Sequence, residues 1–107
     1  MQHKDHFFKE TNTLTMKETI SLAHFLEFQM SESDQPIIEF YETKEDRCIT
    51  TFVLFLFPRG DLLDLNCEID AVLMYFSGNK WYRTNMETRE HFAKDHPYFE
   101  YCWFDFD

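Results

Sequence analysis

The sequence predicts an α+β domain, with a mainly antiparallel sheet of about five strands, an N-terminal helix and a short helix before the last strand, in the order α-β-β-β-β-α-β. Three stretches lead to this prediction. Ile49–Phe57 carries no charge and has the length and the Val, Thr and Phe content of a strand buried inside a sheet. Thr15–Glu18 has the spacing of a helix capping box. Gly78-Asn79 lies between two apolar runs, as in a two-residue β-hairpin.

A single domain is expected over residues 1–107, because this length supports an apolar core without disulfides. The chain is 19% aromatic, with 13 Phe, and 28% charged, which indicates a large core under a soluble surface. Residues 1–14 are expected to be a loosely packed lead-in that Phe7 and Phe8 can pin to the domain. This lead-in has no apolar signal region, and the three cysteines are widely spaced and odd in number, so we expect a cytoplasmic protein with reduced thiols.

The first helix is predicted over residues 16–30. Thr15 is its N-cap, and apolar residues such as Leu22 and Phe25 follow at helical spacing. The polar run Ser31–Pro36 ends the helix, because a proline cannot continue it.

Two strands are expected to follow as a hairpin. Residues 37–43 form the first strand and residues 48–57 the second, with the polar residues 44–47 as their turn. This turn would place Phe40 opposite Thr51. The side chains that would then share one face are Ile38, Phe40, Thr51, Val53 and Phe55.

Residues 62–76 fit two patterns. Apolar residues recur at a spacing of three and four, as in a helix, yet Leu63–Ala71 alternates strictly between apolar and polar residues. We prefer the strand, because the alternation is the stronger pattern and a hairpin turn follows it, and Pro58–Gly60 before it can form a three-residue turn. That turn would place Phe55 opposite Leu63 and would continue the apolar face of the sheet.

The C-terminal third of the chain completes the predicted sheet. The elements expected there are a hairpin at Gly78-Asn79 that pairs Phe76 with Trp81 and Tyr75 with Tyr82, a helix over residues 86–95 capped by Thr84 or Asn85, and an aromatic strand over residues 99–106. Both helices can pack on one face of the sheet.

The charge of the chain limits its partners. Its net charge is −10, from 20 Asp and Glu against 10 Lys and Arg. Such a field repels phosphate backbones and anionic membranes, so we expect neither direct nucleic-acid binding nor membrane binding. It attracts basic proteins and speeds their association, although acidity also serves solubility alone.

The predicted strands bring acidic and apolar side chains together on the second face of the sheet, opposite the face under the first helix. An apolar centre beside an acidic rim is the anatomy of a protein-binding surface. The predicted partner-binding residues are Glu39, Asp64, Glu68, Asp70, Phe52, Leu54 and Trp81. The alternative is that the short helix and the C-terminal segment cover the apolar part of this face and leave the acids only solvated.

No catalytic residue, metal or cofactor is predicted. Asp64, Glu68 and Asp70 would chelate a metal ion poorly, because strand residues two or four positions apart spread over about 7–13 Å. Asp34 followed by Glu42-Thr-Lys44 has the residue types of a metal-dependent nuclease, but this pattern is common by chance. The sequence also has no nucleophile elbow and no glycine-rich phosphate loop.

Three functions fit these observations. The first is a small acidic inhibitor, either an immunity-type protein that neutralises a basic toxin or nuclease by occluding its cleft, or an acidic DNA mimic that inhibits a nucleic-acid enzyme. The second is a small ligand-binding or enzymatic domain, whose pocket residues would be Tyr41, Tyr75, Tyr82, His24 and Glu27. The third is a structural homodimer joined through the second face or through residues 99–106. We predict the immunity-type inhibitor, and therefore a binding protein rather than an enzyme.

Overall fold

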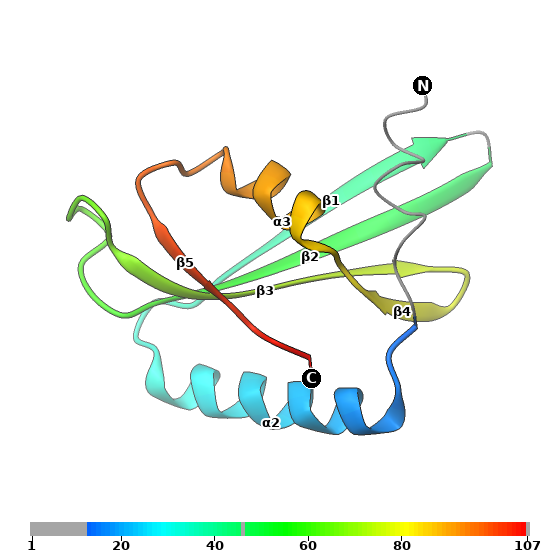
Figure 1. Ribbon diagram of the computed structural model, residues 1–107, viewed down its shortest axis with the longest axis horizontal. Helices are drawn as coiled ribbons and strands as arrows, with labels where there is room; N and C mark the ends of the chain where they lie inside the picture. Colours follow the sequence, from blue (N-terminus) through cyan, green and yellow to red (C-terminus); the bar gives the residue numbers. More distant parts are fainter. Residues whose placement is uncertain (1–12, 46, 107) are drawn as a thin grey trace.

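The computed structural model describes residues 13–45 and 47–106 and confirms the predicted α+β fold and element order (Figure 1). Most of the predicted lead-in, with Phe7 and Phe8, lies outside the described residues. The elements are α2 (Met16–Glu32), β1 (Ile37–Glu45), β2 (Cys48–Pro58), β3 (Glu68–Ser77), β4 (Lys80–Arg83), α3 (Met86–Ala93) and β5 (Glu100–Trp103). Neither helix is long and apolar enough to cross a membrane, which holds for the described residues only.

β3 is the central strand of the sheet. β2 pairs with one edge of β3, and β1 pairs with the outer edge of β2, in both cases antiparallel. The other edge of β3 is shared by two strands, since β4 pairs antiparallel with Met74–Ser77 and β5 pairs parallel with Glu68–Ala71. The sheet is therefore mainly antiparallel. β5, the last strand along the chain, is its parallel strand.

Both helices begin at side chains that cap them. Thr15 Oγ1 accepts a bond from the Glu18 N–H at 3.1 Å, and the Thr15 N–H donates to Glu18 Oε1 at 2.8 Å, which confirms the predicted capping box. The Thr15 N–H and the ion pair with Arg83 favour the charged carboxylate, so the pKa of Glu18 is lowered. α3 is capped by Asn85, whereas Thr84 is buried and donates to the carbonyl of Leu73 at 2.8 Å.

The two predicted hairpins are present. The β3–β4 turn at Gly78-Asn79 has φ angles of 58° and 64°, as a type I′ turn requires, and it pairs Phe76 with Trp81 as predicted. The β1–β2 hairpin is two residues out of the predicted register, because Phe40 pairs with Val53 instead of Thr51. A shift by two positions keeps every side chain on its predicted face.

The strand predicted within residues 62–76 is confirmed for residues 68–76, but residues 63–67 are not in a strand. β2 continues through Pro58, which pairs with Ile69, and residues 59–67 form a loop before β3. Asp61 Oδ1 accepts a bond from the Leu63 N–H at 2.9 Å, which is the side-chain contact of an Asx turn. The alternative helix over residues 62–76 is excluded, because residues 68–77 are a strand.

The helices lie on opposite faces of the sheet, which corrects the expectation that they share one face (Figure 1). The α3 face of the sheet is dominated by Phe52, Leu54, Leu56, Ile69 and Leu73, all at most 3% exposed. On the α2 face, Leu22 packs with Val72, Met74 and Phe106. The chain's own short helix therefore covers the face that was expected to be open.

Candidate functional site

The structure separates the predicted partner-binding residues. Phe52 and Leu54 are 3% and 2% exposed in the core under α3, so they belong to no surface. Trp81 is half-exposed on the α2 face, where it pairs with Phe76. The β2–β3 register causes this separation. Phe55 pairs with Val72, which is nine positions beyond its predicted partner, Leu63. A shift by an odd number moves every β3 side chain to the other face of the sheet.

Glu39 is also apart from the other acids. It lies on the α3 face of β1, where its Oε1 accepts a bond from the Tyr41 hydroxyl at 2.6 Å. This bond to a carboxylate, with partial burial, raises the pKa of Tyr41 to about 12. The Tyr41 ring in turn contacts the ring of Phe92 on α3, with centroids 5.1 Å apart. Glu39 therefore helps to seat α3 on the edge of the sheet.

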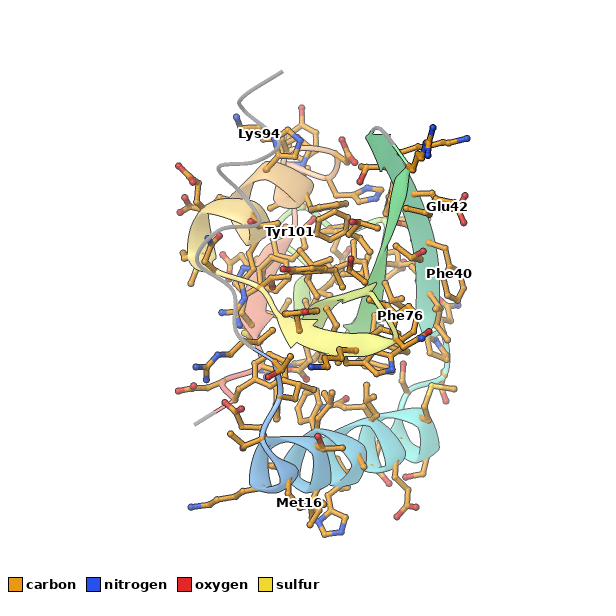
Figure 2. The ribbon with its side chains drawn as sticks, turned by 90° about the vertical axis from the view of Figure 1, so that its right-hand side faces the viewer. Met16, Phe40, Glu42, Phe76, Lys94 and Tyr101 are labelled. Atoms are coloured by element: carbon orange, nitrogen blue, oxygen red, sulfur yellow. The ribbon has the colours of Figure 1, made fainter. Side chains whose placement is uncertain are left out.

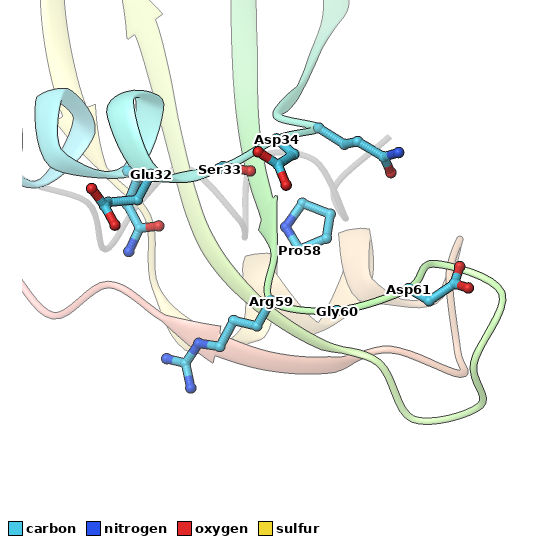
Figure 3. Close-up of a pocket in the computed structure, with 9 residues that line it drawn as sticks. Glu32, Ser33, Asp34, Pro58, Arg59, Gly60 and Asp61 are labelled. Atoms are coloured by element: carbon cyan, nitrogen blue, oxygen red, sulfur yellow. The ribbon is translucent and has the colours of Figure 1, made fainter.

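Asp64, Glu68 and Asp70 do lie near one another, at the end of the domain where β2 meets β3. Here the β2–β3 loop lies beside the turn after α2, and the two segments line a pocket of about 540 Å³ (Figure 3). A second hollow of about 270 Å³ shares Arg59–Asp61 with this pocket and is also lined by the rest of the β2–β3 loop. The exposed carboxylates around these hollows, which we call the acidic end, are Glu32, Asp34, Asp61, Asp64 and Glu68.

Asp70 has a structural role beneath the acidic end. The Arg59 guanidinium binds both of its oxygens, with Nε to Oδ2 at 2.9 Å, and Gln29 of α2 donates to Oδ2 at 3.1 Å. The bond to Asp70 raises the pKa of Arg59 above its ordinary value. Arg59 also forms an ion pair with Glu68 at 3.3 Å, where both side chains are half-exposed. Asp70 therefore joins the end of α2 to the start of the loop and is 9% exposed.

Four carboxylates of the acidic end have no cationic partner among the residues that the structure describes. Glu32, Asp34, Asp61 and Asp64 are exposed, and within the described part of the chain none of them forms an ion pair. In Figure 3, Arg59 extends away from Asp34 and Asp61. The guanidinium is thus engaged by Asp70 and Glu68, and the four acids face solvent.

Two exposed leucines lie in the same loop as Asp61 and Asp64. Leu63 is 90% exposed and Leu65 is 75% exposed, both in the β2–β3 loop. Their alternation with polar residues predicts a strand, so the sequence pattern does not indicate that they are surface residues. Asp61 and Asn66 are the residues that could have indicated a loop here. Asp61 makes the Asx turn, and Asn66 has a φ of 61°.

The residues proposed for a ligand pocket are divided between the two sides of the sheet. Tyr41, Tyr75 and Tyr82 pack on the α3 side. Tyr75 and Tyr82 stack at 4.8 Å on the α3 face, whereas His24 and Glu27 are exposed on α2, on the other side of the sheet. In the nuclease-like pattern, Asp34 lies at the acidic end, whereas Glu42 lies in β1, near the β1–β2 turn. In the described residues, no three His, Cys, Asp or Glu side chains are grouped so that they could hold a metal ion.

Comparison of the chain with protein-family models, with curated proteins and with solved structures found no match. The candidate site is therefore interpreted from its own chemistry. Exposed leucines in one loop with exposed carboxylates suit contact with a protein whose surface carries Lys or Arg beside an apolar patch.

Proposed function

We propose that this protein is a small cytoplasmic inhibitor of the immunity type, which binds a basic toxin or nuclease and occludes its cleft. The observation that carries the proposal is the β2–β3 loop, in which Leu63 and Leu65 are 90% and 75% exposed beside the exposed carboxylates of Asp61 and Asp64. Monomeric proteins rarely expose contiguous apolar patches ringed by one sign of charge unless a partner covers them. The contact surface is the acidic end rather than the face of the sheet.

Each part of the acidic end has a separate task in this proposal. Glu32, Asp34 and Asp64 pair with Lys and Arg at the mouth of the partner's cleft, and the net charge of −10 accelerates the encounter. Leu63 and Leu65 provide the dry centre, where most of the binding energy of an interface is found. Asp70 and Arg59 hold the loop in place and make no contact with the partner.

The first experiment identifies the partner. The chain is co-expressed with the products of the neighbouring genes, and the complex with a basic protein is purified and its activity measured. We expect the partner's toxic or nuclease activity to be lost in the complex. Inhibition that DNA relieves by competition, in an enzyme that binds nucleic acid, would instead indicate a DNA mimic.

The second experiment tests the surface on that purified pair. Leu63→Asp with Leu65→Asp should weaken binding at least about tenfold, mainly through faster dissociation. Asp34→Asn with Asp64→Asn should slow association and flatten its dependence on salt. Met16→Asp is the matched control, because Met16 is 77% exposed on α2. A complex that none of these changes affects would contradict the proposed surface.

A further inference from the structure

The two flanks of α2 pack differently against the sheet. On one flank, the ring centroid of Phe25 lies 4.6 Å from that of Phe104 and 6.4 Å from that of Phe57, so aromatic rings fill the space. On the other flank, α2 carries Thr19 and Ala23, whose short side chains lie one turn apart. An open hollow of about 260 Å³ remains between this flank and the sheet, and we call it the apolar hollow.

The apolar hollow has an almost wholly apolar wall. Leu22 and Leu26 of α2 line it on one side, and Phe55, Met74 and Trp81 line it from three strands, β2, β3 and β4. Trp81 is 43% exposed. Small-molecule sites are concave and mostly apolar, and their volumes begin at about 300 Å³. The apolar hollow therefore suits a ligand with a small apolar body.

A hollow with polar groups adjoins the apolar hollow at the edge of β4. This polar hollow has a volume of about 360 Å³ and shares Leu14, Thr19 and Trp81 with the apolar one. It is also lined by Thr13 and Lys80, which offer a hydroxyl and an ammonium group as hydrogen-bond donors. Lys80 is exposed and forms no ion pair with any residue that the structure describes. Neither hollow has a carboxylate among its described lining residues, so the free charge there is positive.

We propose that the two hollows form one binding site for a small carboxylic acid with an apolar body, such as a medium-chain fatty acid. The hydrocarbon chain lies in the apolar hollow and fills the space that the short side chain of Ala23 leaves open. The carboxylate pairs with Lys80 in the polar hollow, and Trp81 packs against the chain where the hollows meet. One ammonium group matches one negative charge, which favours a carboxylate over a divalent phosphate.

The net charge of −10 does not oppose this ligand strongly, because the acidic end is far from Lys80. The acidic end lies where α2 ends, whereas the polar hollow borders its first turn. The 17 residues of α2 span about 25 Å, which is about three Debye lengths at physiological ionic strength. Glu18, the acid in the first turn of α2, is paired with Arg83. The site is also separate from the surface proposed for a basic protein, so either proposal can fail without the other.

Titration of the whole chain with octanoate, followed by NMR of the indole N–H groups, tests the proposal. The chain has two tryptophans. We expect a saturable shift of the Trp81 signal and none of Trp103, which packs on the α3 side of the sheet. A Kd of about 1 mM or less is expected for a ligand of this size. Hexanoate should bind more weakly, by about fourfold for each buried CH₂ that it lacks.

Two pairs of variants test the two halves of the site. Ala23→Leu occupies the apolar hollow and should weaken octanoate binding at least about tenfold, because it displaces several CH₂ groups of the ligand. Ala23 is exposed and leucine favours helices, so this variant should fold. Ser21→Leu is its matched control, since Ser21 is exposed on α2 and lines neither hollow.

Lys80→Gln removes the ammonium group and should weaken octanoate binding about threefold while leaving binding of uncharged octanol unchanged. Lys94→Gln changes the net charge equally and should bind octanoate like the parent chain. Figure 2 shows Lys94 on the other side of the sheet from α2.

The absence of a saturable shift at the Trp81 indole overturns the proposal, as do equal effects of Ala23→Leu and Ser21→Leu. Equal effects of Lys80→Gln and Lys94→Gln overturn the assignment of the carboxylate to Lys80. Binding that is seen only after residues 1–12 are deleted overturns the proposal too, because it assigns the apolar hollow to the chain's own N-terminal segment.

Discussion

The two faces of the sheet are covered to different extents, and the longer helix covers less. α3 has 8 residues, yet Phe92 contacts both Tyr41 of β1 and Phe52 of β2, at centroid distances of 5.1 and 5.0 Å. α2 has 17 residues, but Phe40 of β1 stays 68% exposed on its face. The α3 side of the sheet is therefore closed out to its edge, and the α2 side is not.

The α2 side stays open because of the positions at which α2 is attached to the sheet. Its first turn is held by the ion pair between Glu18 and Arg83 of β4, and its last turn by the bond from Gln29 to Asp70 of β3. Both anchors lie on the half of the sheet away from β1. Coverage thus depends on where a helix is tied down and on the size of the side chains it carries, rather than on its length.

The largest loss of unfolding free energy is expected from a substitution in the core under α3. Leu54→Ala removes a side chain that is 2% exposed and should cost about 2–5 kcal/mol of unfolding free energy. Urea titration followed by circular dichroism measures this cost. A loss below about 1 kcal/mol would mean that this face is not packed as described.

An intermediate effect is expected where α2 begins. Thr15→Ala removes the N-cap oxygen and should destabilise the domain by about 1 kcal/mol. Thermal unfolding checks this value, and Thr19→Ala is the control, because the Thr19 hydroxyl donates only to the exposed Thr15 carbonyl. Equal effects of the two changes would contradict the role of the capping box.

A pH-dependent effect should follow from Glu18. Its pKa is lower in the folded chain than the ordinary value of 4.5, so the stabilisation is fully present above about pH 4.5 and is lost as the pH falls through the folded pKa. Glu18→Gln removes this contribution. The difference in unfolding free energy between the two proteins should therefore shrink between neutral and strongly acidic pH, and a constant difference would argue against the shift.

The smallest effect is expected at the open side of the α2 face. Phe40→Ala, measured at low salt, should change the unfolding free energy by no more than about 0.5 kcal/mol, because the ring is largely exposed. A cost comparable to that of Leu54→Ala would show that the ring is covered in solution.

The elements that depend on neighbouring residues could be predicted from the sequence. The capping box at Thr15 and the hairpin at Gly78-Asn79 are set by side chains and φ angles within a few positions, and both were predicted correctly. The β2–β3 connection was not, because its register is determined by packing across the sheet. Pro58 and Gly60 suggested a turn, but Pro58 remains in β2.

The candidate site could be predicted only in part. Asp64 and Glu68 were identified from the charge pattern and do lie at the acidic end. Phe52 and Leu54 were assigned to a surface because nothing local in the sequence shows that α3 returns on the second face. Leu63 was placed in the sheet, since regular alternation within an irregular loop cannot be told from a strand by its period alone.

The last described residues of the chain have a consequence for its synthesis. Trp103 packs on the α3 side of the sheet, and Phe106 on the α2 side, where it joins Leu22 of the first helix. α2 therefore emerges from the ribosome early but finds part of its apolar cover only when residue 106 has emerged. Until then the aromatic face of β2 and β3 is incomplete, so the nascent chain should depend on chaperones and fold late, in a single step.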